Sequence, residues 1–240
     1  MLQFLKKALK KSNNSNIITE FEELNFKKPL EELNFQRLKN LLRYTKKNNV
    51  GYNGINHEFG YHSFKFKNEY IRGQREIGER FIEIKPLLKG KNILDIGSNQ
   101  GGVLYYLSDV IKSGIGIDYD FKMVNVANKL KNITEKTNIE FYVFDLEHEN
   151  FKVIDNLISS NKIDVVFLLS VCMWIKNWKN LIDYCSELCN EMVFETNGSI
   201  EEQNSQIEYL NFKYKSVQVH SEYSNDDLNQ KNRKLLICSK

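Results

Sequence analysis

Residues 91–102, KNILDIGSNQGG, constrain the fold of this chain more than any other stretch. Its first half, NILDI, has the apolar character of a buried strand, with Asp95 as the one charged residue. A turn rich in glycine follows, and apolar residues at 103, 104 and 107 then continue at helical spacing. Strand, glycine turn and helix form the opening unit of a doubly wound α/β sheet. Such a turn presents backbone N–H groups and a helix N-terminus to a ligand at the carboxyl end of the strand.

The residues of the turn separate two classes of cofactor that use this geometry. A dinucleotide site needs G-x-G-x-x-G, in which the second glycine leaves the backbone bare for the pyrophosphate. Here Asn99 stands at the second glycine and would obstruct a diphosphate, while Asp95 would repel one. An acid before the turn suits a cationic ligand instead, so we expect no NAD site.

The order D-x-G-x-N-x-G, from Asp95 to Gly101, resembles the first motif of class I S-adenosylmethionine-dependent methyltransferases, whose usual form is D/E-x-G-x-G-x-G. Asn99 at the middle glycine is a departure that the family tolerates. The resemblance covers roughly residues 75–240. It implies S-adenosyl-L-methionine as the cofactor and a Rossmann-like fold.

Apolar strands and amphipathic helices alternate from residue 91 onward. The near-continuous apolar run at 163–170 is typical of a central parallel strand that is buried on both faces. We therefore expect an α/β fold: a seven-stranded, mostly parallel Rossmann-like sheet with a C-terminal antiparallel hairpin, helices on both faces and an N-terminal helical and aromatic cap. Further strands are expected at 114–118, 139–145, 191–196, 212–220 and 233–240.

The sequence divides into two expected domains. Residues 1–75 are expected to hold the N-terminal helices and a substrate-binding cap, and residues 76–240 the S-adenosylmethionine-binding methyltransferase domain. Residues 30–44 have the apolar periodicity of a helix. Residues 48–75 are dense in Gly, Asn, Tyr, Phe and His. A loop of that composition suits a ligand-binding surface better than a scaffold.

Composition and charge limit the partners and the cellular compartment that we expect for this chain. The first 50 residues carry 11 Lys or Arg against 5 Asp or Glu; they could meet phosphates or an acidic membrane surface, but a solvated helical face is the simpler expectation. The four cysteines form no C-x-x-C pair, which favours reduced thiols in a cytoplasmic protein over a zinc site. No apolar run reaches transmembrane length, and no signal-peptide pattern opens the chain. The excess of Asn, Lys and Ile fits an A/T-rich bacterial genome.

The family resemblance implies a set of cofactor contacts at the ends of successive strands. Asp118, in GIGIDYD, would hold both ribose hydroxyls, and Tyr119 could cover the adenine. Asp145, in FYVFDLE, would accept from the adenine amino group. Ser170 ends the fourth strand, where the methyl is transferred. The expected cofactor-binding residues are Gln74, Arg75, Asp95, Gly97, Ser98, Asn99, Gly101, Asp118, Tyr119, Asp145, Leu146 and Ser170.

Acceptor and catalytic residues are expected in the cap and at two strand ends. Methyl transfer depends mostly on positioning, and a general base is needed only for a poorly acidic acceptor. Arg75 could hold an anionic group in a bidentate geometry that Lys does not reproduce. We expect no metal site, although HEFGYH at 57–62 contains two histidines. The catalytic candidates are His57, His62 and Glu195, and the substrate-binding candidates are Tyr61, His62, Arg75 and Trp174.

The expected function is methyl transfer to a small-molecule acceptor, such as a sugar or a phosphate-bearing precursor of bacterial surface (capsular) polysaccharide. Two alternatives stay open. Residues 170–196 also resemble wobble-uridine-modifying members, and the basic N-terminal segment could hold phosphates, so a tRNA methyltransferase is the first. The second is a binding module without turnover, because SVCMWI lacks the His that small-molecule members commonly carry there. The acceptor and the oligomeric state do not follow from the sequence.

Overall fold

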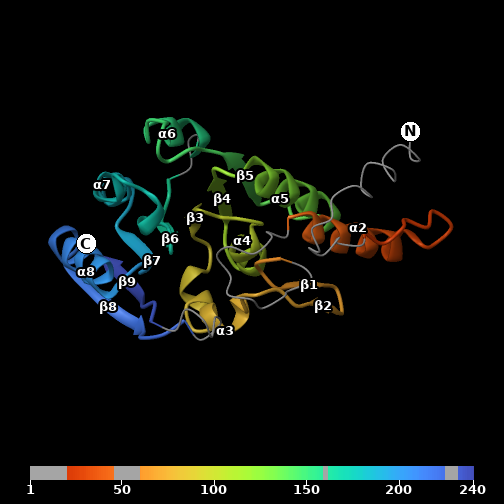
Figure 1. Cartoon of the computed structure of the whole chain (residues 1–240), viewed down its shortest axis with the longest axis horizontal. Coiled ribbons are helices and arrows are strands. Elements are labelled where there is room, and N and C mark those ends of the chain that lie inside the picture. Colours follow the sequence, from red (N-terminus) through yellow and green to blue (C-terminus); the bar gives the residue numbers. More distant parts are fainter. Residues whose placement is uncertain (1–20, 46–59, 159–161, 225–231) are drawn as a thin grey trace, which may run out of the picture.

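The computed structural model describes residues 21–45, 60–158, 162–224 and 232–240 (Figure 1). The expected catalytic candidate His57 and residues 48–59 of the aromatic segment 48–75 lie outside these ranges.

A seven-stranded sheet forms the centre of the molecule, in the order β5-β4-β3-β6-β7-β9-β8. The first five strands of this order are parallel to one another, and β9 runs antiparallel to both β7 and β8. This confirms the mostly parallel Rossmann-like sheet and its C-terminal antiparallel hairpin. The strands are β3 (Asn92–Ile96), β4 (Ser113–Asp118), β5 (Ile139–Val143), β6 (Val165–Leu169), β7 (Glu191–Glu195), β8 (Ser216–Ser221) and β9 (Leu235–Ser239).

Helices cover both faces of the sheet, and a separate apolar core lies between the sheet and the helices on each face. Successive strand residues point to opposite faces, so Leu94 enters the core under α6, α7 and α8, while Ile93 enters the core under α3, α4 and α5. A 3₁₀ turn follows α3 at residues 85–88. The helices are α3 (Ile77–Phe81), α4 (Gly102–Leu107), α5 (Phe121–Ile133), α6 (Val153–Ile158), α7 (Trp178–Leu188) and α8 (Ile200–Lys213).

All four cysteines are buried in the core under α6, α7 and α8, and none is in a disulfide. Burial raises the pKa of each thiol above its usual value, so all four remain protonated at neutral pH. The cysteines are Cys172, Cys185, Cys189 and Cys238.

Two helix starts follow directly from local sequence. Asp120 accepts the backbone N–H groups of Lys122 and Met123 and so caps α5. Ser199 and Glu202 form a reciprocal capping box at the start of α8.

The described part of the N-terminal region packs on the rest of the fold beside α5. Helix α2 (Leu30–Tyr44) matches the expected helix, and Leu38 and Leu42 share a core with Val126 and Leu130 of α5. Strands β1 (Phe64–Phe66) and β2 (Glu69–Ile71) form a hairpin whose phenylalanines enter the same core. Figure 1 shows α2 and this hairpin at the β5 side of the sheet, away from β8. No helix in the described ranges is long and apolar enough to cross a membrane.

Two glycines give a test of how tightly this N-terminal region is held. A Cβ at Gly73 would lie 2.4 Å from the backbone carbonyl of His62, whereas a Cβ at Gly78 meets only a Tyr106 ring carbon at 3.7 Å. We expect Gly73→Ala to lower the free energy of unfolding by about 1–3 kcal/mol, since backbone cannot move aside as a side chain can. The matched control Gly78→Ala, inside α3, should instead raise it by about 0.5–1 kcal/mol. Chemical denaturation measures both, and equal effects would contradict the close approach.

Candidate active site

The glycine turn after β3 is built from residues in the left-handed backbone region. Gly97, Asn99 and Gly101 have φ values of 81°, 52° and 79°. Among residues with a side chain, asparagine adopts this region at the lowest cost. The Asn99 side chain folds back, and its Oδ1 accepts the backbone N–H of Gln100 at 2.8 Å. Asn99 therefore preserves the turn that a glycine usually makes at this position.

Asp118 closes the turn from the neighbouring strand. Its Oδ2 accepts the backbone N–H of Asn99 at 2.8 Å, and its Oδ1 accepts that of Asp120 at 2.9 Å. Both oxygens of this carboxylate therefore hold the turn, and the side chain lies at the carboxyl end of β4. Tyr119 follows directly and is 68% exposed, which suits a side chain that covers a ligand.

Two buried polar atoms beside the turn lack a hydrogen-bond partner within the described part of the chain. They are Oδ2 of Asp95 and Oγ of Ser98. Burial, reinforced by the charge of Asp118, raises the pKa of Asp95 to about 7. Buried polar groups are nearly always hydrogen-bonded, so such a pair fits the ammonium-bearing end of a ligand. The residues present therefore suit the cofactor that the sequence implies.

Asp145 lies on the exposed loop after β5. Its Oδ2 pairs with Nδ1 of His148 at 2.8 Å, and its Oδ1 accepts the backbone N–H of Glu147 at 2.9 Å. The His148 contact and then that N–H lower the pKa of the carboxyl. Leu146 is half-buried against the core under α6, α7 and α8. Contact of these two residues with adenine stays a prediction.

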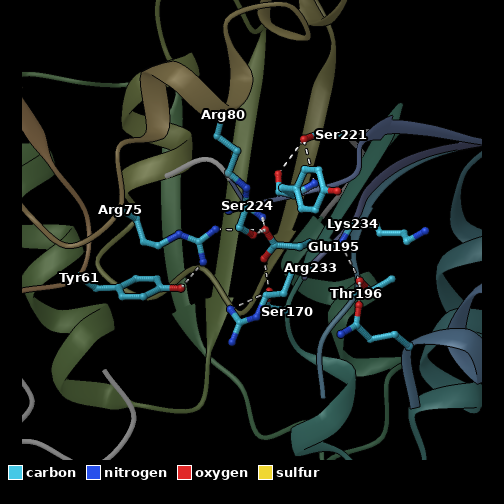
Figure 2. Close-up of polar contacts among 12 residues, drawn as sticks. Tyr61, Arg75, Arg80, Ser170, Glu195, Thr196, Ser221, Ser224, Arg233 and Lys234 are labelled. Carbon is cyan, nitrogen blue, oxygen red and sulfur yellow. Dashed lines mark hydrogen bonds and ion pairs between the residues drawn. The ribbon is translucent and has the colours of Figure 1, made fainter. Parts of the chain in front are cut away.

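Glu195, at the end of β7, is the centre of a buried polar cluster (Figure 2). Its Oε1 lies 3.1 Å from Nη2 of Arg75 and 2.5 Å from Nη2 of Arg80. It also accepts the hydroxyl groups of Ser170 and Ser224. Burial by itself would raise the pKa of Glu195, but the two guanidinium groups hold it at about 2. So acidic a group accepts a proton poorly at neutral pH.

The cap reaches this cluster through three of its expected residues. The hydroxyl of Tyr61 accepts Nη1–H of Arg75 at 3.1 Å, and His62 forms a backbone bridge with Arg75. The His62 ring packs where a Cβ on Gly102 would stand, at the start of α4. Burial, then Arg75 and Arg80, lower the pKa of His62 to about 3, so the ring is neutral at pH 7. Tyr61, His62 and Arg75 are thus gathered between the glycine turn and Glu195.

The other expected site residues lie around this centre. Gln74 is half-buried, and its backbone N–H donates to the carbonyl of Gly60 at 3.2 Å. Trp174 ends the 3₁₀ turn Cys172–Trp174 after β6 and is 70% exposed. Within the described ranges no group of three His, Cys, Asp or Glu side chains is placed to hold a metal.

One side chain that joins the cap to the cofactor turn could not be found by sequence reasoning. Gln100 is fully buried, and its Oε1 accepts the backbone N–H groups of Tyr61 and His62, both at 3.3 Å. Its Nε2 donates to the hydroxyl of Thr45, just after α2. A glutamine at a variable position of the turn carries no recognisable signal, because its partners lie 38 to 55 residues away.

Removal of this side chain should loosen the cap. Gln100→Ala leaves the N–H groups of Tyr61 and His62 without their acceptor and removes a bond to the Thr45 hydroxyl, which still donates to the Leu42 carbonyl; each orphaned buried group costs about 1–3 kcal/mol. We expect a loss of about 2–4 kcal/mol in the free energy of unfolding, against about 1–2 kcal/mol for Thr45→Val, which removes the bond to Gln100 and the bond from the hydroxyl to the Leu42 carbonyl. Urea denaturation of both variants measures the difference. A Gln100→Ala protein as stable as the parent would show that water replaces the amide at no cost.

The raised pKa of Asp95 predicts two opposite pH effects. Below pH 7 the carboxyl is neutral and attracts an ammonium weakly, so affinity for S-adenosylhomocysteine should rise about tenfold from pH 6 to pH 8. In the unliganded protein this carboxyl should contribute a loss of stability as pH rises towards 7, because the folded state binds its proton more tightly than the unfolded chain does. His62 contributes the opposite slope, because its pKa is about 3 in the folded protein and near 6.5 in the unfolded chain. Calorimetry and thermal unfolding, each compared between the parent and Asp95→Asn, check the two effects: the variant should lose the rise in affinity, and its stability should increase more steeply with pH than that of the parent. Equal profiles would contradict the raised pKa of Asp95.

Comparison with known proteins agrees with this geometry. The sequence model of a family described as "Methyltransferase domain" matches residues 68–234. A protein described as methyltransferase 235L, from Invertebrate iridescent virus 6, is 29% identical over 101 residues, which cover 41% of this chain and 33% of that protein. This alignment thus spans about a third of the length of that relative.

Two solved structures share the fold. The N-terminal domain of EvdMO1 with SAH bound has a TM-score of 0.61 and 13% identity, and the match covers 88% of this chain and 97% of that one. The bifunctional kinase-methyltransferase WbdD has a TM-score of 0.55 and 18% identity, and the match covers 70% of this chain and 40% of that one. At these identities the likeness concerns the fold alone.

Proposed function

Because this chain belongs to the methyltransferase-domain family, whose cofactor is S-adenosyl-L-methionine, we propose that it methylates a small-molecule acceptor in the cytoplasm. The acceptor is a sugar or a phosphate-bearing precursor of bacterial surface (capsular) polysaccharide. The observation that carries the proposal is the unsatisfied, buried carboxylate of Asp95 beside a left-handed glycine turn.

Each part of the cofactor has residues suited to hold it. Asp95 and Ser98 would receive the amino-acid end, and Asp118 would accept from the ribose hydroxyls in a bidentate manner. Tyr119, Asp145 and Leu146 are assigned to the adenine. When bound, the cofactor supplies an electrophilic methyl group on a sulfonium.

The cap and the Glu195 cluster would orient the acceptor. With pKa values of about 2 and about 3, neither Glu195 nor His62 is an effective base at neutral pH. The proposal therefore gives both residues a positioning role, and Tyr61 and Arg75 share it. His57 stays the candidate base, if one is needed. Without a base, the acceptor atom must already be nucleophilic at neutral pH.

Two observations support a small acceptor. The cap residue His62 packs directly against Gly102 on the first turn of α4, so the described part of the cap lies close over the cofactor turn. The N-terminal domain of EvdMO1 was crystallised in the presence of SAH and D-fucose, which supports a sugar-like acceptor for this chain.

Isotope-labelled methyl transfer to a metabolite extract tests the proposal. We expect the label in the small-molecule fraction; label in the RNA fraction would favour a tRNA methyltransferase, and no transfer despite cofactor binding would favour a silent binding module. Calorimetry should show binding of S-adenosylhomocysteine and none of NAD.

Asp118→Asn is the matched variant for this assay. It keeps one acceptor oxygen for the turn but weakens the charge-assisted bonds to the ribose, so affinity for S-adenosylhomocysteine should fall at least tenfold. An unchanged dissociation constant would mean that Asp118 only shapes the turn.

A further inference from the structure

Arg233 is a half-buried residue that the sequence did not single out, and it lies just before β9 at the functional edge of the sheet. Its Nη1 donates to Oγ of Ser170 at 3.2 Å. Within the described ranges it forms no ion pair with a carboxylate, whereas Arg75 and Arg80 both pair with Glu195. Its other N–H donors are therefore available to a ligand.

Ser170 holds this guanidinium in place. It has a φ of 58°, a left-handed conformation that is uncommon for a serine and that concentrates at functional sites. Its hydroxyl donates to Glu195 and accepts from Arg233, so it links the arginine to the buried carboxylate. Figure 2 shows Arg75, Arg80 and Arg233 reaching this point from three directions.

Three guanidinium groups lie around the buried carboxylate of Glu195, and all three, Arg233 included, help to lower its pKa. Partly buried positive charge is costly unless a negative group compensates it. Arg75 is 1% exposed and is bound by both Tyr61 and Glu195, whereas Arg233 is half-buried and can be reached from solvent.

We propose that Arg233 binds an oxyanionic group of the acceptor, a phosphate or a carboxylate, and so selects an anionic acceptor. This inference rests on the proposed function and narrows it. The acceptor would place its anion on Arg233 next to Ser170, the residue directly after β6. The planar fork of arginine offers two parallel N–H donors to such an anion, which a lysine does not.

Thermal unfolding of the S-adenosylhomocysteine complex tests the site with inorganic phosphate and with acetate, each against chloride at equal ionic strength. We expect one oxyanion to raise the midpoint at millimolar concentration, and the more effective of the two identifies the group. Arg233→Gln and Arg233→Lys should weaken its apparent affinity at least tenfold. The control Lys234→Ala should not, because within the described part of the chain that side chain forms its ion pair with the exposed Glu222.

A second measurement uses the product. Labelled product from the metabolite extract should bind an anion-exchange resin, and Arg233→Gln should lower its formation while calorimetry finds the cofactor affinity unchanged. An oxyanion effect that is absent, or equal in parent and Arg233→Gln, would overturn the inference, as would a neutral labelled product. Failure of S-adenosylhomocysteine to bind would instead overturn the proposed function.

Discussion

The buried carboxylate of Glu195 is the interaction on which the functional edge depends. It joins segments that are far apart in sequence: the cap through Arg75, α3 through Arg80, and the end of β8 through Ser224. Loss of one partner of a buried ion pair leaves the other charge uncompensated and costs about 3–5 kcal/mol. An apolar replacement of the whole group could fold as well, so its value lies in specificity. It fixes one relative placement of cap, sheet and C-terminal hairpin.

The parts of the molecule that could be predicted are those with a local pattern. Strands β3 to β7 follow from apolar runs of period two or from full burial, and the turn at 97–101 follows from its glycines. The strand-end position of Asp118 and the helix at 30–44 were evident for the same reason. Each of these features depends on residues that lie close together in the sequence, so a single sequence is enough to predict them.

The rest of the site arises from contacts that no local pattern encodes. Arg75 and Glu195 are 120 residues apart, and Gln100 and Thr45 are 55 apart. Glu195 was expected as a base because it ends a strand, but its chemistry is set by two arginines that sequence spacing does not bring together. Arg233 opens the expected strand 233–240, and nothing in its sequence neighbourhood sets it apart from other charged residues. Sequence periodicity predicts the helices and strands, whereas the charge environment of the site depends on contacts that form only in the folded protein.

The complete burial of the four thiols has a practical consequence. A thiolate is the reactive form of cysteine, and here no thiol is both ionised and accessible, so a maleimide should leave the native protein unmodified. A single cysteine introduced at an exposed position, such as Tyr119 beside the turn or Trp174 after β6, would then be the sole labelling point. The wild-type chain is thus already a suitable background for attaching one fluorophore or spin label and following how the site responds to its ligands.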